Sequence, residues 1–111
     1  MSIRETVREL NAGLGPTLVA ALSGSRDRRA SIGWEAGEGP GPDEASSERL
    51  RCALAQWKAV EAAEGADVAR MWFLGSNPWL GEDSPINAIR EGWFGEVAIA
   101  AQALVQDAFS G

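Results

Sequence analysis

The sequence predicts an all-α fold, and three observations lead to this prediction. Apolar residues recur at intervals of three and four, for example at Leu50, Leu54, Trp57 and Val60, which places them on one helix face. Ser, Gly and Pro stand at positions that begin or end helices. No run alternates β-branched and polar residues as a half-buried strand does. With 111 residues, the chain forms one small domain, or two small modules that share a core.

The first third of the chain predicts three helices. Ser2 is the expected N-cap of the first, with Glu5 at the reciprocal position of a capping box. Pro16 suits the first turn of the second helix, because its missing N–H is not needed there. The helices expected in this third cover residues 2–14, Thr17–Leu22, and Ser25 or Arg26 to about Ala36.

The rest of the chain predicts four more helices after a loop. Residues 37–43, GEGPGPD, are too rich in Gly and Pro to form a helix or a central strand. The expected N-caps are Ser46 or Ser47, then Asp67, then Ser84. The helices expected here run to about Glu64, from Asp67 to about Trp72, from Pro85 to Arg90 or Glu91, and from Trp93 to about Phe109.

The segment Ala69–Pro85, ARMWFLGSNPWLGEDSP, is predicted to form a compact apolar turn. Its Gly and Pro residues interrupt any long helix. Asn77 is expected to tie the backbone of the turn through hydrogen bonds, while Pro78 fixes the next φ. The aromatic rings are expected to support the last helix. The turn residues singled out as structural are Trp72, Phe73, Asn77, Trp79 and Pro85.

Composition excludes several classes of function. The net charge of −6 argues against a generally basic nucleic-acid binder. The chain has no His, and no phosphate loop, dinucleotide fingerprint or metal-ligand spacing is present. The sequence therefore predicts neither enzyme nor catalytic residues, and no cofactor or metal. The single Cys52, the lack of a signal peptide and the lack of a membrane-spanning stretch predict a cytoplasmic protein.

The first three predicted helices form a candidate helix-turn-helix. Residues 1–37 hold five Arg and four acidic residues, so an anion-binding surface is expected there. If the third helix begins near Ser25, three arginines in four residues lie at its start, where they can pair with phosphates and guanine edges. The alternative is a solvated face balanced by Asp27. The candidate DNA-binding residues are Ser25, Arg26, Arg28 and Arg29.

Two segments carry a resemblance to a known family. SRDRRASIGWEAGEGPGP resembles the end of an Xre-type helix-turn-helix, through Trp34, Gly37 and a following Pro. MWFLGSNPWLGEDSPINAIREGWFGEVAIAAQALV resembles the C-terminal domain of the Xre/MbcA/ParS antitoxins. The matching positions there are Asn77, Leu80, Pro85, Ile89, Gly92 and Val97. The resemblance predicts an Xre-like module with a long connecting helix over residues 1–64 and an MbcA/ParS-like toxin-binding domain over residues 65–111.

The resemblance implies a toxin-neutralising protein. Members of this family bind a RES-domain toxin, an enzyme that degrades NAD, and inhibition by the C-terminus is steric. Phe109 is the expected anchor, with packing of its ring onto its own domain as the alternative. The toxin-facing residues carried over onto this chain are Gln106, Asp107, Phe109, Ser110 and Gly111.

Three functions follow as hypotheses. The first is the antitoxin of a type II toxin–antitoxin system, which blocks a RES-domain toxin and also represses its own promoter. The second is a helix-turn-helix regulator without a toxin, in which residues 66–111 serve dimerisation. The third is a helical adaptor for an unrelated partner. The expected assembly is a homodimer, or a hetero-oligomer with the toxin, and no membrane is involved.

Overall fold

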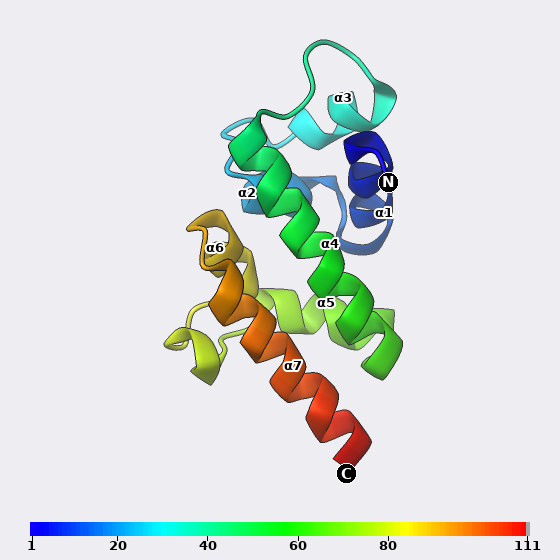
Figure 1. Cartoon of the computed structure of the whole chain (residues 1–111). Coiled ribbons are helices and arrows are strands. Elements are labelled where there is room, and N and C mark those ends of the chain that lie inside the picture. The colour runs from blue at the N-terminus through cyan, green and yellow to red at the C-terminus, as the bar shows by residue number, and fades with distance from the viewer. Residues whose placement is uncertain (111) are drawn as a thin grey trace.

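The central element of the molecule is the helix α4, Glu44–Glu64. The computed structural model describes residues 1–110, with side chains as far as Phe109, and within them every regular element is helical. Figure 1 shows α1, α2 and α3 at one end of the molecule, while α7 runs toward the other end, where the chain finishes. The elements are α1 Ile3–Leu14, α2 Pro16–Ser23, α3 Ala30–Ala36, α4, α5 Ala66–Leu74, the 3-10 turn η1 Pro78–Leu80, α6 Pro85–Arg90 and α7 Phe94–Ser110.

One continuous core runs through this elongated molecule, which measures 46 × 24 × 20 Å. The helix α4 packs against α1, α2, α5, α6 and α7. The predicted apolar face of α4 is confirmed, because Leu50, Leu54, Trp57 and Val60 are all buried. The helix α4 contributes to both ends of the core and packs against α5, α6 and α7 on the other side of residue 64. The expected division into two domains at residue 64 stays a prediction.

Most predicted helix ends are confirmed to within one or two residues. Ser2 accepts a hydrogen bond from the Glu5 N–H at 3.2 Å, as the capping box requires. Gly15, with a φ of 90°, separates α1 from α2, and Pro16 follows at the first helical position. The last helix begins at Phe94 and ends at Ser110, each one residue later than predicted.

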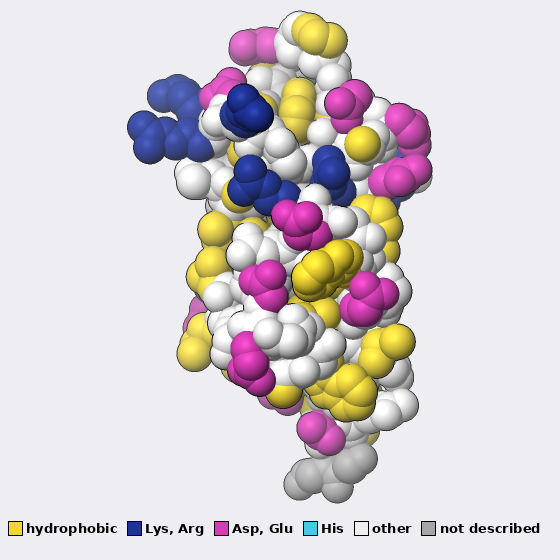
Figure 2. All heavy atoms as spheres, turned by 90° about the vertical axis from the view of Figure 1, so that its left-hand side faces the viewer, with side chains coloured by type: hydrophobic (Ala, Val, Ile, Leu, Met, Phe, Trp, Pro, Cys, Tyr) yellow, Lys and Arg dark blue, Asp and Glu magenta, His cyan; other side chains and the backbone are white. Residues whose placement is uncertain are grey.

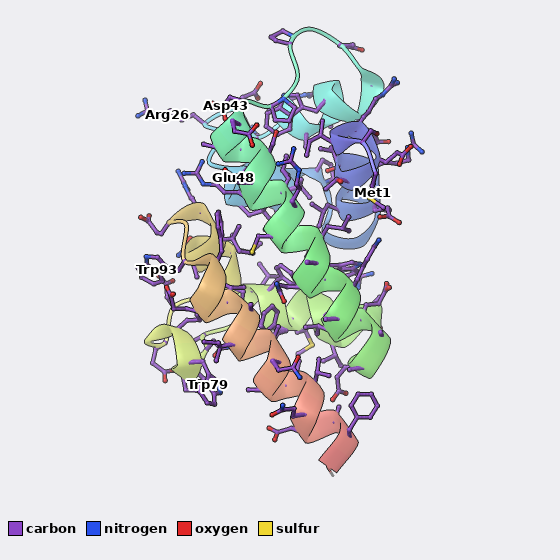
Figure 3. The ribbon with its side chains drawn as sticks, viewed as in Figure 1. Met1, Arg26, Asp43, Glu48, Trp79 and Trp93 are labelled. Atoms are coloured by element: carbon purple, nitrogen blue, oxygen red, sulfur yellow. The ribbon has the colours of Figure 1, made fainter. Side chains whose placement is uncertain are left out.

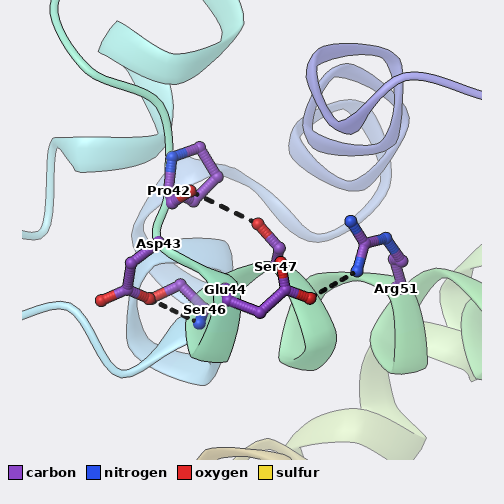
Figure 4. A network of polar contacts seen from close by, with 6 residues as sticks. All are labelled: Pro42, Asp43, Glu44, Ser46, Ser47 and Arg51. Carbon is purple, nitrogen blue, oxygen red and sulfur yellow. Dashed lines mark hydrogen bonds and ion pairs between the residues drawn. The ribbon is translucent and has the colours of Figure 1, made fainter.

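Two predicted N-caps are wrong. The N-cap of α4 is Asp43, and neither Ser46 nor Ser47, so the helix begins at Glu44. Asp43 Oδ1 accepts a hydrogen bond from the Ser46 N–H at 2.8 Å (Figure 4). The carboxylate is a stronger acceptor at this position than a hydroxyl, and it sits at the positive end of the helix dipole. This hydrogen bond lowers the pKa of Asp43, with a smaller contribution from Arg49.

The predicted N-cap of α5, Asp67, is wrong for a different reason. The helix begins at Ala66, immediately after Gly65, whose φ of 89° reverses the chain at the end of α4. Asp67 therefore lies inside the first turn, where it accepts a hydrogen bond from Arg70 Nη1 at 2.7 Å. A glycine that ends one helix here also fixes the start of the next.

The two ends of the molecule are joined at Gly13 in α1. Its carbonyl accepts a hydrogen bond from Arg70 Nε of α5 at 2.7 Å. The indole of Trp57 in α4 lies directly over its Cα, so that an added Cβ would stand 2.5 Å from a ring carbon. Only glycine allows α1 and α4 to approach this closely.

Candidate protein-binding site

The turn after α5 is built around Asn77. Its Oδ1 accepts a hydrogen bond from the Trp79 N–H at 2.9 Å, and its carbonyl accepts from both Leu80 and Glu82. Its own N–H donates to the Asp83 carbonyl at 3.1 Å, which closes the turn. Four hydrogen bonds thus converge on this one buried residue, as the sequence predicts for an Asn at a turn.

The aromatic residues of the turn do not share one environment. Phe73 is fully buried and contacts Trp72 edge to face at a centroid distance of 5.1 Å, as well as Trp57 of α4 at 6.1 Å. Trp72 is half-buried. Trp79, which was expected to support the last helix, lies beside α7 but is 60% exposed, while the neighbouring Leu80 is 5% exposed. A three-residue 3-10 turn points consecutive side chains in different directions, so Leu80 enters the core and Trp79 does not.

The short helix α6 is anchored as predicted. Ser84 accepts a hydrogen bond from the Asn87 N–H at 3.2 Å, and Pro85 is buried at the first helical position. Asp83 supports this cap by accepting hydrogen bonds from the Ser84 N–H and from Asn87 Nδ2. The rigid turn and cap together fix the direction in which α7 leaves the domain.

The end of α7 projects from the molecule. Gln106 and Asp107 are exposed, and Phe109 is 83% exposed. The ring therefore does not pack onto its own domain, which removes the alternative considered for it. The side chain of Ser110 and the whole of Gly111 lie outside the described residues, so their predicted role in toxin binding stays a prediction.

Exposed large apolar side chains concentrate in the C-terminal half of the chain. Of the nine that the described residues contain, only Met1 and Ile32 lie before residue 65. Large patches of exposed apolar side chains mark protein interaction sites, whereas apolar side chains scattered singly over a surface are ordinary. The C-terminal members are Val68, Met71, Leu74, Trp79, Trp93, Ile99 and Phe109.

A hollow of about 350 Å³ lies between η1 and the start of α7. Trp79 and Trp93 form two of its walls, and Figure 3 shows both side chains on the same side of the molecule. Trp93 was not singled out from the sequence, because local sequence does not show whether a Trp at a predicted helix start is buried or exposed. The remaining lining residues are Leu80, Gly81 and Glu96.

The predicted recognition helix does not include the arginine cluster. The helix α3 begins at Ala30, and Ser25–Arg29 form a turn before it. The Ser25 hydroxyl accepts from the Asp27 N–H at 3.1 Å, while Asp27 Oδ1 accepts from the Arg29 N–H at 2.9 Å. These local side-chain hydrogen bonds hold the backbone in a turn where the sequence predicted helix.

The arginines of this turn are nevertheless displayed. Arg26, Arg28 and Arg29 are exposed, and within the described part of the chain none of them forms an ion pair. Figure 2 shows that the basic side chains of this face gather toward the end of the molecule that carries this turn, where acidic side chains also lie, while the other end carries acidic and apolar side chains.

Chemistry at a metal or at a reactive thiol has no support in the geometry. Across residues 1–109, no three His, Cys, Asp or Glu side chains cluster as metal ligands do. Burial raises the pKa of the Cys52 thiol to about 11, although a hydrogen bond with Gln56 opposes this rise. None of the described helices has the length and apolarity needed to traverse a bilayer.

Comparison with known proteins gives one solved structure of the same fold. No protein-family model matches the sequence, and no curated protein matches it. The chain is similar to a chain of the crystal structure of the M. tuberculosis MbcT–MbcA toxin–antitoxin complex, with a TM-score of 0.78. The match covers 96% of both chains at 22% sequence identity. The likeness therefore extends over the entire arrangement of helices.

Proposed function

We propose that this protein is the antitoxin of a type II toxin–antitoxin system and that it binds and sterically blocks a RES-domain toxin that degrades NAD. The observation that carries this proposal is the shared fold over 96% of a chain taken from a toxin–antitoxin complex. The motif resemblance in MWFLGSNPWLGEDSPINAIREGWFGEVAIAAQALV supplies the antitoxin role and the RES toxin. The action is non-enzymatic.

The exposed end of α7 supports a steric mechanism. Phe109 offers a large apolar group without any cost of removing it from a core, because it is already 83% exposed. Asp107, also exposed, places a negative charge two positions earlier. An NAD site must hold a pyrophosphate with positive donors, so an anionic, apolar segment is complementary to such a site.

Removal of Gln106–Gly111 tests this mechanism. Cells that express the toxin with the full chain should keep their NAD, whereas cells that express the truncated chain should lose it. Phe109→Ala should give part of this loss, and Ile32→Ala, which removes an exposed apolar side chain far along the sequence, should give none. Full protection by the truncated chain would refute the proposal that the tail blocks the toxin.

A second activity, repression of the protein's own promoter, rests on the exposed arginines of the Ser25–Arg29 turn. Because they precede α3 and do not lie on it, we infer that they contact DNA phosphates more than base edges. The net charge of −6 opposes the approach to DNA, so binding requires a dimer that doubles these contacts.

Replacement of Arg26, Arg28 and Arg29 by Ala tests the DNA contact. Binding to the promoter fragment should be lost, with a shallower salt dependence in any residual binding. Arg90→Ala, in the other half of the chain, is the matched control and should bind normally. A protein that binds DNA through these residues but leaves the toxin active would be the regulator without a toxin partner.

A further inference from the structure

We propose that the hollow between Trp79 and Trp93 receives a cationic side chain of the toxin, preferably an arginine. This inference rests on the proposed antitoxin function and adds a second contact beside the one proposed at the end of α7, since Trp79 also borders a hollow that Asp107 lines. The hollow, of about 350 Å³, is open to solvent between η1 and the first turn of α7. It is lined by Trp79, Trp93 and Glu96, together with Leu80 and Gly81.

Both indoles are presented from backbone that is already fixed. The N–H of Trp79 is held by Asn77 Oδ1 at 2.9 Å, while the buried Leu80 next to it anchors the turn in the core. Trp93 donates its N–H to the Ala88 carbonyl at 2.9 Å and accepts the first bond of α7 from Val97 at 3.0 Å. Ordering of the backbone is therefore complete before a partner arrives, which lowers the entropic cost of binding.

Trp79 and Trp93 are both substantially exposed to solvent in the folded chain. Trp79 is 60% exposed and Trp93 is 41% exposed. Apolar groups of this size in water are unfavourable for solubility, and two of them beside one hollow form the kind of anchor site that dominates protein interfaces.

The charge of the hollow selects the kind of side chain that fits. Glu96 belongs to none of the ion pairs in the described residues. Its carboxylate and the electron-rich faces of the indoles both attract a cation. Residues 68–111 contain five acidic residues and two basic ones, and Figure 2 shows acidic side chains among the apolar ones over this part of the surface.

Arginine fits this site better than lysine. Its planar guanidinium stacks on an aromatic face while its N–H groups donate to a carboxylate. Its aliphatic stem also covers apolar wall such as that of Leu80. The partner surface is therefore a basic side chain surrounded by apolar atoms, and the toxin is the partner that the proposed function provides.

The test first isolates, by co-purification with this chain, the RES-domain toxin that the proposed function requires, and then measures the affinity of the purified chain for it. Trp79→Ala and Trp93→Ala should each bind about 30-fold more weakly, as hot-spot residues do. Glu96→Lys should bind about 10-fold more weakly and should alter the salt dependence. Ile32→Ala, at another exposed apolar residue, and Glu64→Lys, with the same change of charge, are the controls, and they should bind as the wild type does.

The outcomes separate this inference from the proposed function. If the wild type binds tightly and the Trp variants bind equally well, the hollow is not a contact and the inference is wrong, while the antitoxin proposal stands. If the wild type does not bind, the antitoxin proposal fails and the inference fails with it. If a Trp variant has a lowered melting temperature, Glu96→Lys decides alone, and wild-type affinity would overturn the inference.

Analytical sedimentation of the chain without toxin tests the other candidate occupant of the hollow, which is a second copy of this chain that offers Arg26, Arg28 or Arg29. A dimer that Trp79→Ala dissolves would assign the hollow to self-association and would overturn its assignment to the toxin. A sedimentation profile that this variant leaves unchanged supports the toxin as the occupant.

Discussion

Asn77 holds the backbone of Trp79 while most of this residue stays in contact with solvent: Asn77 Oδ1 accepts a hydrogen bond from the Trp79 N–H at 2.9 Å, and Trp79 is 60% exposed. The turn therefore separates two tasks that the sequence alone had combined. Its backbone and Leu80 maintain the fold, while its largest side chain remains available to a partner.

Substitution of Asn77 should destabilise the protein through this cap. Asn77→Ala removes the acceptor of the Trp79 N–H and should lower the free energy of unfolding by about 1 kcal/mol. Asn77→Ser keeps a hydroxyl at the cap position and should recover most of that loss. Urea unfolding followed by Trp fluorescence measures both. Equal stability of the Ala variant and the wild type would show that the cap is dispensable.

The neighbours Trp79 and Leu80 should differ sharply in their effect on stability. Leu80→Ala creates a cavity at a buried position and should cost about 2–5 kcal/mol. Trp79→Ala removes an exposed ring and should change the free energy of unfolding by less than about 0.5 kcal/mol. Thermal and urea unfolding provide the comparison. A large loss for Trp79→Ala would mean that the ring is part of the core.

Gly13→Ala should strain the contact between α1 and α4. The added methyl group would stand 2.5 Å from a ring carbon of Trp57, so Trp57 or α1 must shift, at about 1–3 kcal/mol. Gly33→Ala is the matched control within a helix, because nothing lies within 4 Å of its added Cβ. The control should be neutral or stabilising. Equal stability of the two variants would contradict the close approach.

The cap at Asp43 should make stability depend on pH. Hydrogen bonding to the Ser46 N–H lowers its pKa below the ordinary value of 3.8. Its contribution is therefore fully present above 3.8 and disappears as the pH falls through the lowered pKa of the folded state. The melting temperature of Asp43→Ala should lie below that of the wild type at pH 7, and the difference between the two melting temperatures should be smaller at about pH 2.

Asp43→Asn is the control for that measurement. Its amide oxygen caps the helix without titrating, so its advantage over Asp43→Ala should be the same at both pH values. A gap between wild type and Asp43→Ala that does not change with pH would show that the ionised form is not what stabilises α4.

Cys52 should react slowly in the folded protein. Burial raises its pKa to about 11, which leaves at least about a hundredfold less thiolate at pH 8 than in an ordinary cysteine. Reaction with a colorimetric disulfide reagent should therefore be at least about a hundredfold slower in the native state than in guanidinium. Equal rates in the two conditions would contradict this burial.

Much of the fold is predictable from local sequence. The all-α class, the apolar faces of α1 and α4, the caps at Ser2 and Ser84 and the extent of α7 follow from side-chain periodicity and capping chemistry. These features depend on residues within a few positions of one another. They are therefore already present in the sequence as it is read along the chain.

The wrong predictions arise where two local preferences compete. At Ser25–Arg29, helix propensity competes with hydrogen bonds from the Ser25 and Asp27 side chains to nearby backbone, and the turn prevails. At α4, three residues near its start are all acceptable caps, and Asp43 is used. The energy differences between such alternatives are about 1 kcal/mol, which is too small for sequence patterns to resolve.

The sequence by itself determined that helices form, where most of them end, and that residues 69–85 contain an apolar turn. Only the tertiary structure decided which rings of that turn face the core. Phe73, one position after a half-buried Trp72, meets Trp57 of α4, whereas Trp79 borders solvent together with Trp93. Burial depends on which distant helix covers a residue, and only the packing of α4, α5 and α7 provides or withholds that cover.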